Sequence, residues 1–239
     1  MILAAGRGER MRPLTDASPK PLLRVGGKSL MEYHLENLGR AGLVEIVINH
    51  AHLGQMIECA LGNGERYGVD IRYSHEPVAL ETAGGITNAL AILKNGPTYN
   101  YGERPFLVIN ADIYCEIDFS TLLSVMKHMQ ARPDENLAHL VLVDNPPHHA
   151  DGDFALDSGK VVLSGKNNLT FSGIGIYQPK FFKDIVPGSV AKLAPLLRQA
   201  ISSDKIGGEH YRGVWVDVGT PERLHLLDVQ LRASVKASE

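Results

Sequence analysis

Short apolar runs alternate with amphipathic segments through the first half of the chain. The runs MILAA, VEIVIN, VDIRYS and FLVIN are predicted strands, and LMEYHLENLGRAG, LGQMIECAL, TAGGITNALAILKN and FSTLLSVMKHMQ are predicted helices. In the helix expected from Leu30, Leu35 lies on the apolar side, Glu32 and Glu36 lie on the polar side, and Gly42 is a plausible C-cap. Strands that alternate with helices in this way predict an α/β fold with a mostly parallel sheet.

The pattern changes after about residue 145. The stretch NPPHHADGDFALDSGKVVLSGKNNLTFSGIGIY is punctuated by Pro, Gly, Asp and Asn, which predicts hairpins and loops inserted before the sheet resumes. PKFFKDIV and KLAPLLRQAISSD then predict helices, EHYRGVWVDVG predicts strand, and a last helix has Thr220 as N-cap and Pro221 at its first position. Without a repeat or a low-complexity linker, we expect residues 1–239 to form a single domain.

Composition and charge narrow the classes of partner. A net charge of −3 and a pI near 6.4 give no electrostatic footprint for nucleic acid. No apolar run is long enough to span a membrane and no signal peptide is evident, so we expect a cytoplasmic protein with no membrane partner. The two cysteines, Cys59 and Cys115, lack the spacing of a zinc site or a disulfide framework, and nothing indicates a protein partner.

Residues 3–29, LAAGRGERMRPLTDASPKPLLRVGGKS, combine glycines and cations behind the first predicted strand. Glycine lets a ligand approach the main chain and Arg or Lys neutralises phosphate, so a phosphate-binding loop is one interpretation and a surface turn is the other. The GGKS segment is not a P-loop, because Leu22 stands where that motif needs glycine. A dinucleotide fingerprint fails as well, because Met11 occupies its third glycine position and Pro13 follows.

Three segments together resemble the sugar-1-phosphate nucleotidyltransferases. The spacing G-x-G-x-R-M-x-P-L-T followed by P-K-P-L-L is similar to that family's nucleotide-binding signature, and VINADIY and WVDVGTPE resemble its two metal-carboxylate segments, in the same order. The resemblance implies a Rossmann-like three-layer sandwich with a mostly parallel mixed sheet and a small β-rich sugar-binding insertion, the nucleotide-diphospho-sugar transferase fold. Residues 1–112 would then be the nucleotide-binding half and residues 113–239 the sugar-binding half.

The reaction implied by this resemblance is attack by a sugar-1-phosphate oxygen on the α-phosphate of a nucleoside triphosphate. The nucleophile is already anionic, so catalysis reduces to charge neutralisation and in-line positioning. The catalytic roles fall to Lys20, which matches the family lysine on the reacting phosphates, and to Arg10, on the departing phosphates; a solvated surface lysine is the alternative for Lys20. The nucleotide would lie along Ala4, Ala5, Gly6 and Gly8.

Asp112 and Asp217 are the metal ligands that the resemblance implies. Each follows an apolar run and so lies near the end of a predicted strand, where open α/β sheets bind ligands. Two carboxylates and phosphate oxygens suit Mg²⁺, which prefers hard oxygen ligands. For Asp217 alone, a helix-capping role before GTPE is the alternative.

The segment EPVALETAGGITNAL resembles the base-recognition segment of the family, in which small residues let the backbone read the base edge. Gly84 and Gly85 fit this pattern, whereas Glu81 stands where the family usually has glycine. The Glu81 carboxylate could accept hydrogen bonds from uracil or from guanine, or it could be a solvent-exposed residue opening a helix. Asn49, which ends a predicted strand, is a further candidate for the nucleotide pocket.

On the sugar side, DGDFAL and LTFSGIGIY resemble the segments that line the family's sugar pocket. Gly152 would allow close approach, Asp153 could bind a hydroxyl or amide, and Asn110 could reach sugar or nucleotide. The E-K-P segment common in the family is missing, since the equivalent stretch reads SGKNNLTFSG. His148 and His149 lack acidic or histidine partners at regular spacing and are interpreted as loop residues.

Within the family, ALETAGGI, GDFAL and LTFSGIGIY are most similar to short uridylyltransferases that act on N-acetylmuramic acid α-1-phosphate. The expected substrates are therefore UTP and this sugar-1-phosphate. Mannose-1-phosphate guanylyltransferase is the alternative activity, which GTP and mannose-1-phosphate would reveal. A nonreactive nucleotide-sugar sensor is the alternative of another class, although Lys20, Asp112 and Asp217 argue against it.

Overall fold

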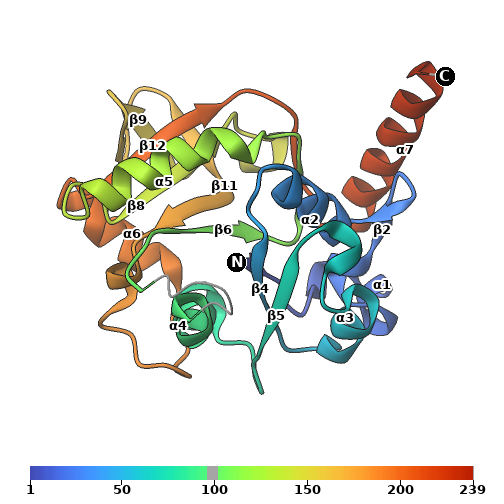
Figure 1. The fold of residues 1–239 in the computed structure, drawn as a ribbon. Coiled ribbons are helices and arrows are strands. Elements are labelled where there is room, and N and C mark those ends of the chain that lie inside the picture. The colour runs from blue at the N-terminus through green and yellow to red at the C-terminus, as the bar shows by residue number, and fades with distance from the viewer. Residues whose placement is uncertain (96–101, 239) are drawn as a thin grey trace.

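A computed structural model describes residues 1–95 and 102–238 (Figure 1), with side chains to residue 234. In this part of the chain, nine strands form one mixed sheet in the order β5-β4-β1-β6-β11-β8-β12-β10-β9. Their bounds are β1 Ile2–Leu3, β4 Glu45–His50, β5 Asp70–His75, β6 Phe106–Asn110, β8 Ala138–Val143, β9 Phe154–Asp157, β10 Lys160–Val162, β11 Asn168–Tyr177 and β12 Ile206–Tyr211. The strands β5, β4, β1 and β6 are parallel, and β11 runs antiparallel to both β6 and β8.

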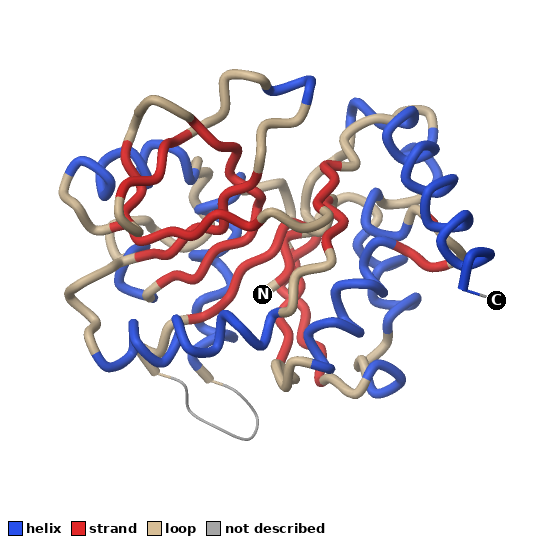
Figure 2. The backbone as a smooth tube through the Cα atoms, turned by 90° about the horizontal axis from the view of Figure 1, so that it is seen from above, coloured by secondary structure: helices blue, strands red, loops and turns tan. Residues whose placement is uncertain are grey.

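Helices cover both faces of this sheet, as the view from above shows (Figure 2). One apolar cluster joins the sheet to α2, α3 and α5, and a second joins its other face to α4 and α6. The helices are α1 Leu14–Ala17, α2 Leu30–Arg40, α3 Gly54–Leu61, α4 Glu81–Lys94, α5 Leu122–Ala131, α6 Leu193–Ser202 and α7 Pro221–Ser238. The three-layer mixed α/β fold expected from the sequence is confirmed.

Strand register places three residues in one row at the carboxyl edge of the parallel strands. Leu3 of β1 pairs with Asn49 of β4 on one side and with Asn110 of β6 on the other. Ligands of open α/β sheets bind beyond such an edge. The loops that follow these strands are therefore the ones that build the site.

Two small ladders lie outside the main sheet. In one, β7 (Ile113–Cys115) pairs antiparallel with β13 (Trp215–Asp217), with Asp217 opposite Ile113. The backbone N–H of Val218 donates to the carbonyl of Asp112 at 2.9 Å. This ladder brings together two segments about half the chain apart. In the other, β2 (Arg24–Val25) pairs with β3 (Lys28–Ser29).

Most helix predictions are confirmed, including their ends. Gly42 follows α2 with a φ of 78°, the left-handed conformation typical of a C-terminal glycine, and Thr220 Oγ1 accepts from the N–H of Arg223 at 3.4 Å at the start of α7. The helix predicted at PKFFKDIV is wrong, since only a 3₁₀ turn forms over Pro179–Phe182. Its neighbouring rings Phe181 and Phe182 are both buried, which shows tertiary packing overriding the local pattern.

Cys59 and Cys115 are both free thiols, and Cys115 is buried whereas Cys59 is exposed. Among the described residues, no helix has both the length and the apolar character that crossing a bilayer requires.

Candidate active site

A cleft of about 440 Å³ opens at the carboxyl edge of β1, β4 and β6. This volume falls in the usual range for small-molecule sites. The cleft brings together the predicted residues Ala4, Ala5, Gly6, Gly8, Arg10, Lys20, Asn49, Glu81, Asn110 and Asp112. Residues from widely separated segments thus converge on one site, as the motif order predicts.

The glycine-rich loop after β1 forms one wall of the cleft. Gly8 has a φ of 71°, and a Cβ built there would lie 2.9 Å from the Thr15 methyl carbon, so this glycine closes a tight turn. Gly6 is different, because a Cβ there would meet no atom within 4 Å. The space beside Gly6 is open to a ligand. Arg10 lines the same wall and makes no hydrogen bond or ion pair with any described residue.

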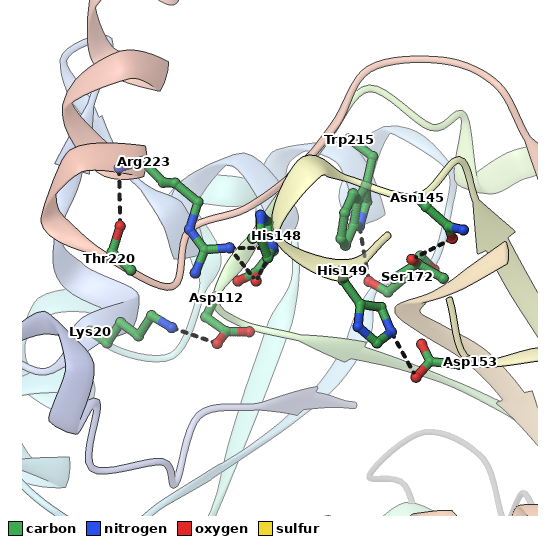
Figure 3. Close-up of polar contacts among 12 residues, drawn as sticks. Lys20, Asp112, Asn145, His148, His149, Asp153, Ser172, Trp215, Thr220 and Arg223 are labelled. Carbon is green, nitrogen blue, oxygen red and sulfur yellow. Dashed lines mark hydrogen bonds and ion pairs between the residues drawn. The ribbon is translucent and has the colours of Figure 1, made fainter. Parts of the chain in front are cut away.

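Lys20 and Asp112 form a close ion pair in the cleft (Figure 3). Lys20 Nζ lies 2.6 Å from Asp112 Oδ2, and the Lys20 side chain is only 10% exposed. Lys20 begins a 3₁₀ turn between Pro19 and Pro21, both buried, which fixes its backbone. A buried lysine directed at a carboxylate is not an ordinary surface lysine.

Asp217 lies next to the cleft, with Gly219, two residues on, in its lining. Arg223 Nη1 donates to Asp217 Oδ2 at 2.8 Å, and His148 Nε2 lies 3.3 Å from the same oxygen. The imidazole also accepts from Arg223, as Figure 3 shows. His148, expected to be a simple loop residue, therefore contacts a predicted metal ligand. Arg223 was missed although it lies in the first turn of the helix that follows Asp217.

A buried polar network links two walls of the cleft. Asn49 Oδ1 accepts from the Ala4 N–H at 2.9 Å, and its Nδ2 donates to Glu76 Oε1 at 2.7 Å. Glu76 Oε2 then accepts from the Leu80 N–H at 3.0 Å. Asn49 and Glu76 are 3% and 1% exposed, yet both contribute to the cleft lining. Glu76 was missed because nothing in the sequence marks its buried partner.

Only part of the segment predicted to recognise the base lines the cleft. Glu81 lines it, with an exposed side chain and a φ of 60°, so a left-handed residue occupies the position where the family usually has glycine. Gly84 and Gly85 are not in the lining, and their part in base recognition stays a prediction. A Cβ at Gly84 would lie 2.3 Å from the Ser189 carbonyl, and one at Gly85 would lie 2.7 Å from the Asn49 amide. Both glycines permit close packing behind the cleft.

The predicted sugar-side residues are divided in the same way. Asn110 lines the cleft and packs over Gly173. Gly152 and Asp153 do not line it. Gly152 has a φ of 63° and packs against the Leu169 carbonyl, which a Cβ would approach to 2.9 Å. Asp153 Oδ2 accepts from the Phe171 N–H at 2.8 Å, and Oδ1 lies 3.1 Å from His149 Nε2.

The carboxylate Oδ2 of Asp153 is thus committed to the backbone of β11, and Oδ1 to a neighbouring imidazole. The first contact fastens the loop after β8 to β11, and the second lies within that loop. In the described conformation, Asp153 has a structural role that the sequence did not indicate.

A buried histidine lies behind the acidic end of the cleft. His34 of α2 is 1% exposed. Burial lowers its pKa to about 4, although a hydrogen bond to the backbone of Ile113 and the negative charge of Asp112 both act to raise this pKa. Its Nε2 has no partner among the described atoms. His34 is therefore neutral at physiological pH.

The residues present fit a hard divalent cation. Asp112 and Asp217 offer carboxylate oxygens from adjoining segments, and the described residues contain no cluster of three or more His, Cys, Asp or Glu for a fully protein-ligated metal. Mg²⁺ usually binds through one or two carboxylates together with substrate phosphates and water. A donor set of this kind needs a phosphate substrate to complete it.

Sequence relatives extend over nearly the whole chain. An N-acetylmuramate α-1-phosphate uridylyltransferase of Neisseria meningitidis serogroup B is 53% identical over 228 residues, 94% of each chain. One of the same description from Caulobacter vibrioides is 32% identical, over 93% of this chain and 92% of its own. A mannose-1-phosphate guanylyltransferase catalytic subunit β of Dictyostelium discoideum is 27% identical, and the aligned region spans 61% of its length.

Solved structures show the same fold at low identity. A Bacillus anthracis structure described as that of a glucose-1-phosphate thymidylyltransferase superposes with a TM-score of 0.81 at 20% identity, covering 97% of this chain and 94% of its own. HddC from Yersinia pseudotuberculosis gives a TM-score of 0.72, also at 20% identity, with 96% and 97% covered. Residues 1–233 match the family described as nucleotidyl transferase. The chain belongs to the nucleotidyl transferase family.

Proposed function

We propose that this protein transfers UMP from UTP to N-acetylmuramic acid α-1-phosphate, giving UDP-N-acetylmuramic acid and pyrophosphate. The observation that carries the proposal is the Lys20–Asp112 pair in a cleft walled by the glycine-rich loop. Sugar and base identity rest on the relative from Neisseria meningitidis. Bacterial cell-wall recycling is the process in which such a product fits, and the cytoplasm is the compartment that we propose.

The residues of the cleft would act by positioning the substrates and by neutralising phosphate charge. Open space beside Gly6 admits the triphosphate, and Arg10 is free to bind the departing β- and γ-phosphates. Lys20 neutralises charge on the reacting phosphate, where the transition state gains most from a fixed cation. The sugar phosphate is already a nucleophile, so no base is needed.

Members of this family generally use a divalent metal, and we propose Mg²⁺ for this one. Asp112 and Asp217 would hold it. When bound, the ion supplies Lewis-acid stabilisation of phosphate charge and a template for the two substrates. In the described structure, Lys20 and Arg223 neutralise these two carboxylates.

Pyrophosphate release tests the proposal. UTP, GTP, dTTP and CTP are each combined with the 1-phosphates of N-acetylmuramic acid, N-acetylglucosamine, glucose and mannose, with Mg²⁺. We expect the highest kcat/KM for UTP with N-acetylmuramic acid α-1-phosphate. Turnover favouring GTP and mannose-1-phosphate would instead identify a guanylyltransferase, and binding of UDP-sugar without any turnover would identify a sensor.

A variant pair tests the mechanism in the same assay. Lys20→Ala removes the cleft lysine and is expected to lower kcat by about 100-fold or more. Lys28→Ala is the matched control, since Lys28 pairs with Glu36 at the surface. Equal turnover by the two variants would contradict the role of Lys20.

A further inference from the structure

The Arg223 guanidinium lies between the end of β13 and the loop that joins β8 to β9. Its side chain is 17% exposed, and it comes from the first turn of α7. Its Nη1 donates both to Asp217, at the end of β13, and to His148, in the loop between β8 and β9. The cation is thus held jointly by the nucleotidyl transfer site and by the β-rich insertion.

Gly219 provides the space in which this guanidinium lies. A Cβ at position 219 would lie 2.2 Å from Arg223 Nη2 and 3.0 Å from its Cζ. Gly219 also lines the cleft. The guanidinium therefore packs against the backbone of a cleft residue, and any larger residue at 219 would displace it. Its place beside the cleft is built into the fold.

Among the described residues, Asp217 is the one carboxylate that pairs with Arg223, and the charge balance of Arg223 depends on it. Arginine stays protonated at all physiological pH values, and a mostly buried cation is costly without an anionic partner. If the Asp217 carboxylate becomes a metal ligand, its charge is shared with the ion and Arg223 loses neutralisation. Arg223 then has donors to offer to a new anion, because a guanidinium carries five N–H groups and only Nη1 is engaged with Asp217 and His148.

We propose that Arg223, with His148 beside it, forms an oxyanion-binding subsite for the sugar substrate, which Asp217 masks in the free protein. This inference rests on the proposed function. The ligand is a sugar carrying an oxyanion: either the C1 phosphate or the carboxylate of the lactyl ether that distinguishes muramic acid from glucosamine. Either group suits the planar guanidinium.

Binding measured by calorimetry without nucleotide and without any divalent metal tests the masking directly. The ligand is N-acetylmuramic acid α-1-phosphate, and the proteins are the wild type, Asp217→Asn, Arg223→Met and the double variant. We expect Asp217→Asn to bind about 10-fold more tightly than wild type, because it frees a charged hydrogen-bond donor. Arg223→Met should bind within about twofold of wild type, because the masked cation contributes little.

The double variant distinguishes unmasking from a general charge effect. If Asp217→Asn acts by freeing Arg223, the gain disappears in the double variant. A gain that persists in the double variant would show that removing a negative charge is enough, and would overturn the proposal. Absence of any gain in Asp217→Asn would overturn it as well.

Two further ligands identify the anion in the Asp217→Asn protein. N-acetylglucosamine 1-phosphate carries only the phosphate, and free N-acetylmuramic acid carries only the carboxylate. If Asp217→Asn increases the affinity for N-acetylglucosamine 1-phosphate and this increase requires Arg223, the subsite binds the phosphate. If the affinity for free N-acetylmuramic acid increases in the same way, the subsite binds the lactyl carboxylate. A gain with neither ligand and none with the full substrate would refute the subsite.

Controls separate this inference from the proposed function and from misfolding. Arg232→Met removes another α7 arginine, one that pairs with Asp228 at the surface, and should match wild type in every arm. Thermal unfolding of each variant checks the fold. Pyrophosphate release by the wild type with Mg²⁺ tests the proposed function alone. An active enzyme without Arg223-dependent binding would therefore refute the subsite but not the proposed function.

Discussion

Asn49, near the end of β4, and Glu76, directly after β5, are joined by one buried hydrogen bond of 2.7 Å. The amide oxygen of Asn49 accepts a hydrogen bond from the backbone N–H of Ala4. The second carboxylate oxygen of Glu76 accepts one from the backbone N–H of Leu80. Through these three hydrogen bonds, the two side chains connect the loop after β1 to the turn before α4, and so hold two walls of the cleft together. The pair therefore positions two segments that line the cleft, around Ala4 and Ala79.

Replacing Asn49 by Ala should destabilise the protein and loosen the cleft. The change leaves the Ala4 N–H and a buried Glu76 oxygen without partners, with an expected loss of about 2 to 4 kcal/mol in the free energy of unfolding. Urea denaturation measures this loss, and the KM for UTP should rise. Asn88→Ala is the control, because the one hydrogen bond of the Asn88 side chain to a described residue is a long contact of 3.3 Å to Ser74. Similar stability of the two variants would refute a stabilising role for the Asn49–Glu76 pair.

Glycines in the cleft and behind it should respond differently to alanine. Gly85→Ala places a methyl group 2.7 Å from the Asn49 amide and from Glu76 Oε1, so unfolding free energy should fall by about 1 to 3 kcal/mol. Gly6→Ala meets no protein atom and should leave stability unchanged while raising the KM for UTP. Thermal unfolding and pyrophosphate release measure both. A stable Gly85→Ala enzyme with impaired UTP binding would restore the base-reading role of Gly85.

Glu81→Gly should stabilise the fold, because glycine adopts a φ of 60° without the strain that glutamate bears. The gain is expected to be about 0.5 to 1 kcal/mol after the greater chain entropy of glycine is counted. Asp204→Gly is the matched control, since Asp204 has a φ of 56° and is far from the cleft lining. If the Glu81 carboxylate binds the base, only Glu81→Gly raises the KM for UTP; equal KM values would leave Glu81 as an exposed helix opener.

Stability should fall as pH decreases from about 6.5 to 4, in part because of His34. Burial lowers the folded-state pKa of His34 to about 4, whereas an unfolded histidine titrates near 6.5, so in this interval the unfolded chain binds a proton that the folded chain does not. The contribution is on the order of 3 kcal/mol and is complete above pH 6.5. Chemical denaturation across this range should show a shallower slope for His34→Gln. An unchanged slope would argue that His34 is protonated in the folded state.

The fold was largely predictable because its strands and helices carry clear periodicity, as in the segments around Val47 and Leu35. The pairing of Lys20 with Asp112 was reachable only through motif order, since 92 residues separate them. Local sequence patterns do not predict contacts between residues so far apart. These contacts form because the sheet register aligns the ends of distant strands.

The remaining site features depend on tertiary packing that a single sequence does not encode locally. His148 reaches Asp217 from 69 residues away, and Glu76 is buried by a partner 27 residues earlier. A glycine in the sequence looks the same whether it admits a ligand, as Gly6 does, or a neighbouring backbone, as Gly84 does. Only the positions of surrounding atoms distinguish the two.

The ladder between β7 and β13 has a consequence for how such an enzyme can change. Backbone pairing of Ile113 with Asp217 sets where the two acidic segments meet, independently of the path that the chain takes between them. The intervening insertion, which includes the loop of His148, can therefore change in length and in its side chains while the spacing of the acidic segments is retained. The acceptor specificity that we propose for this region could then change without moving the two carboxylates that we propose as metal ligands.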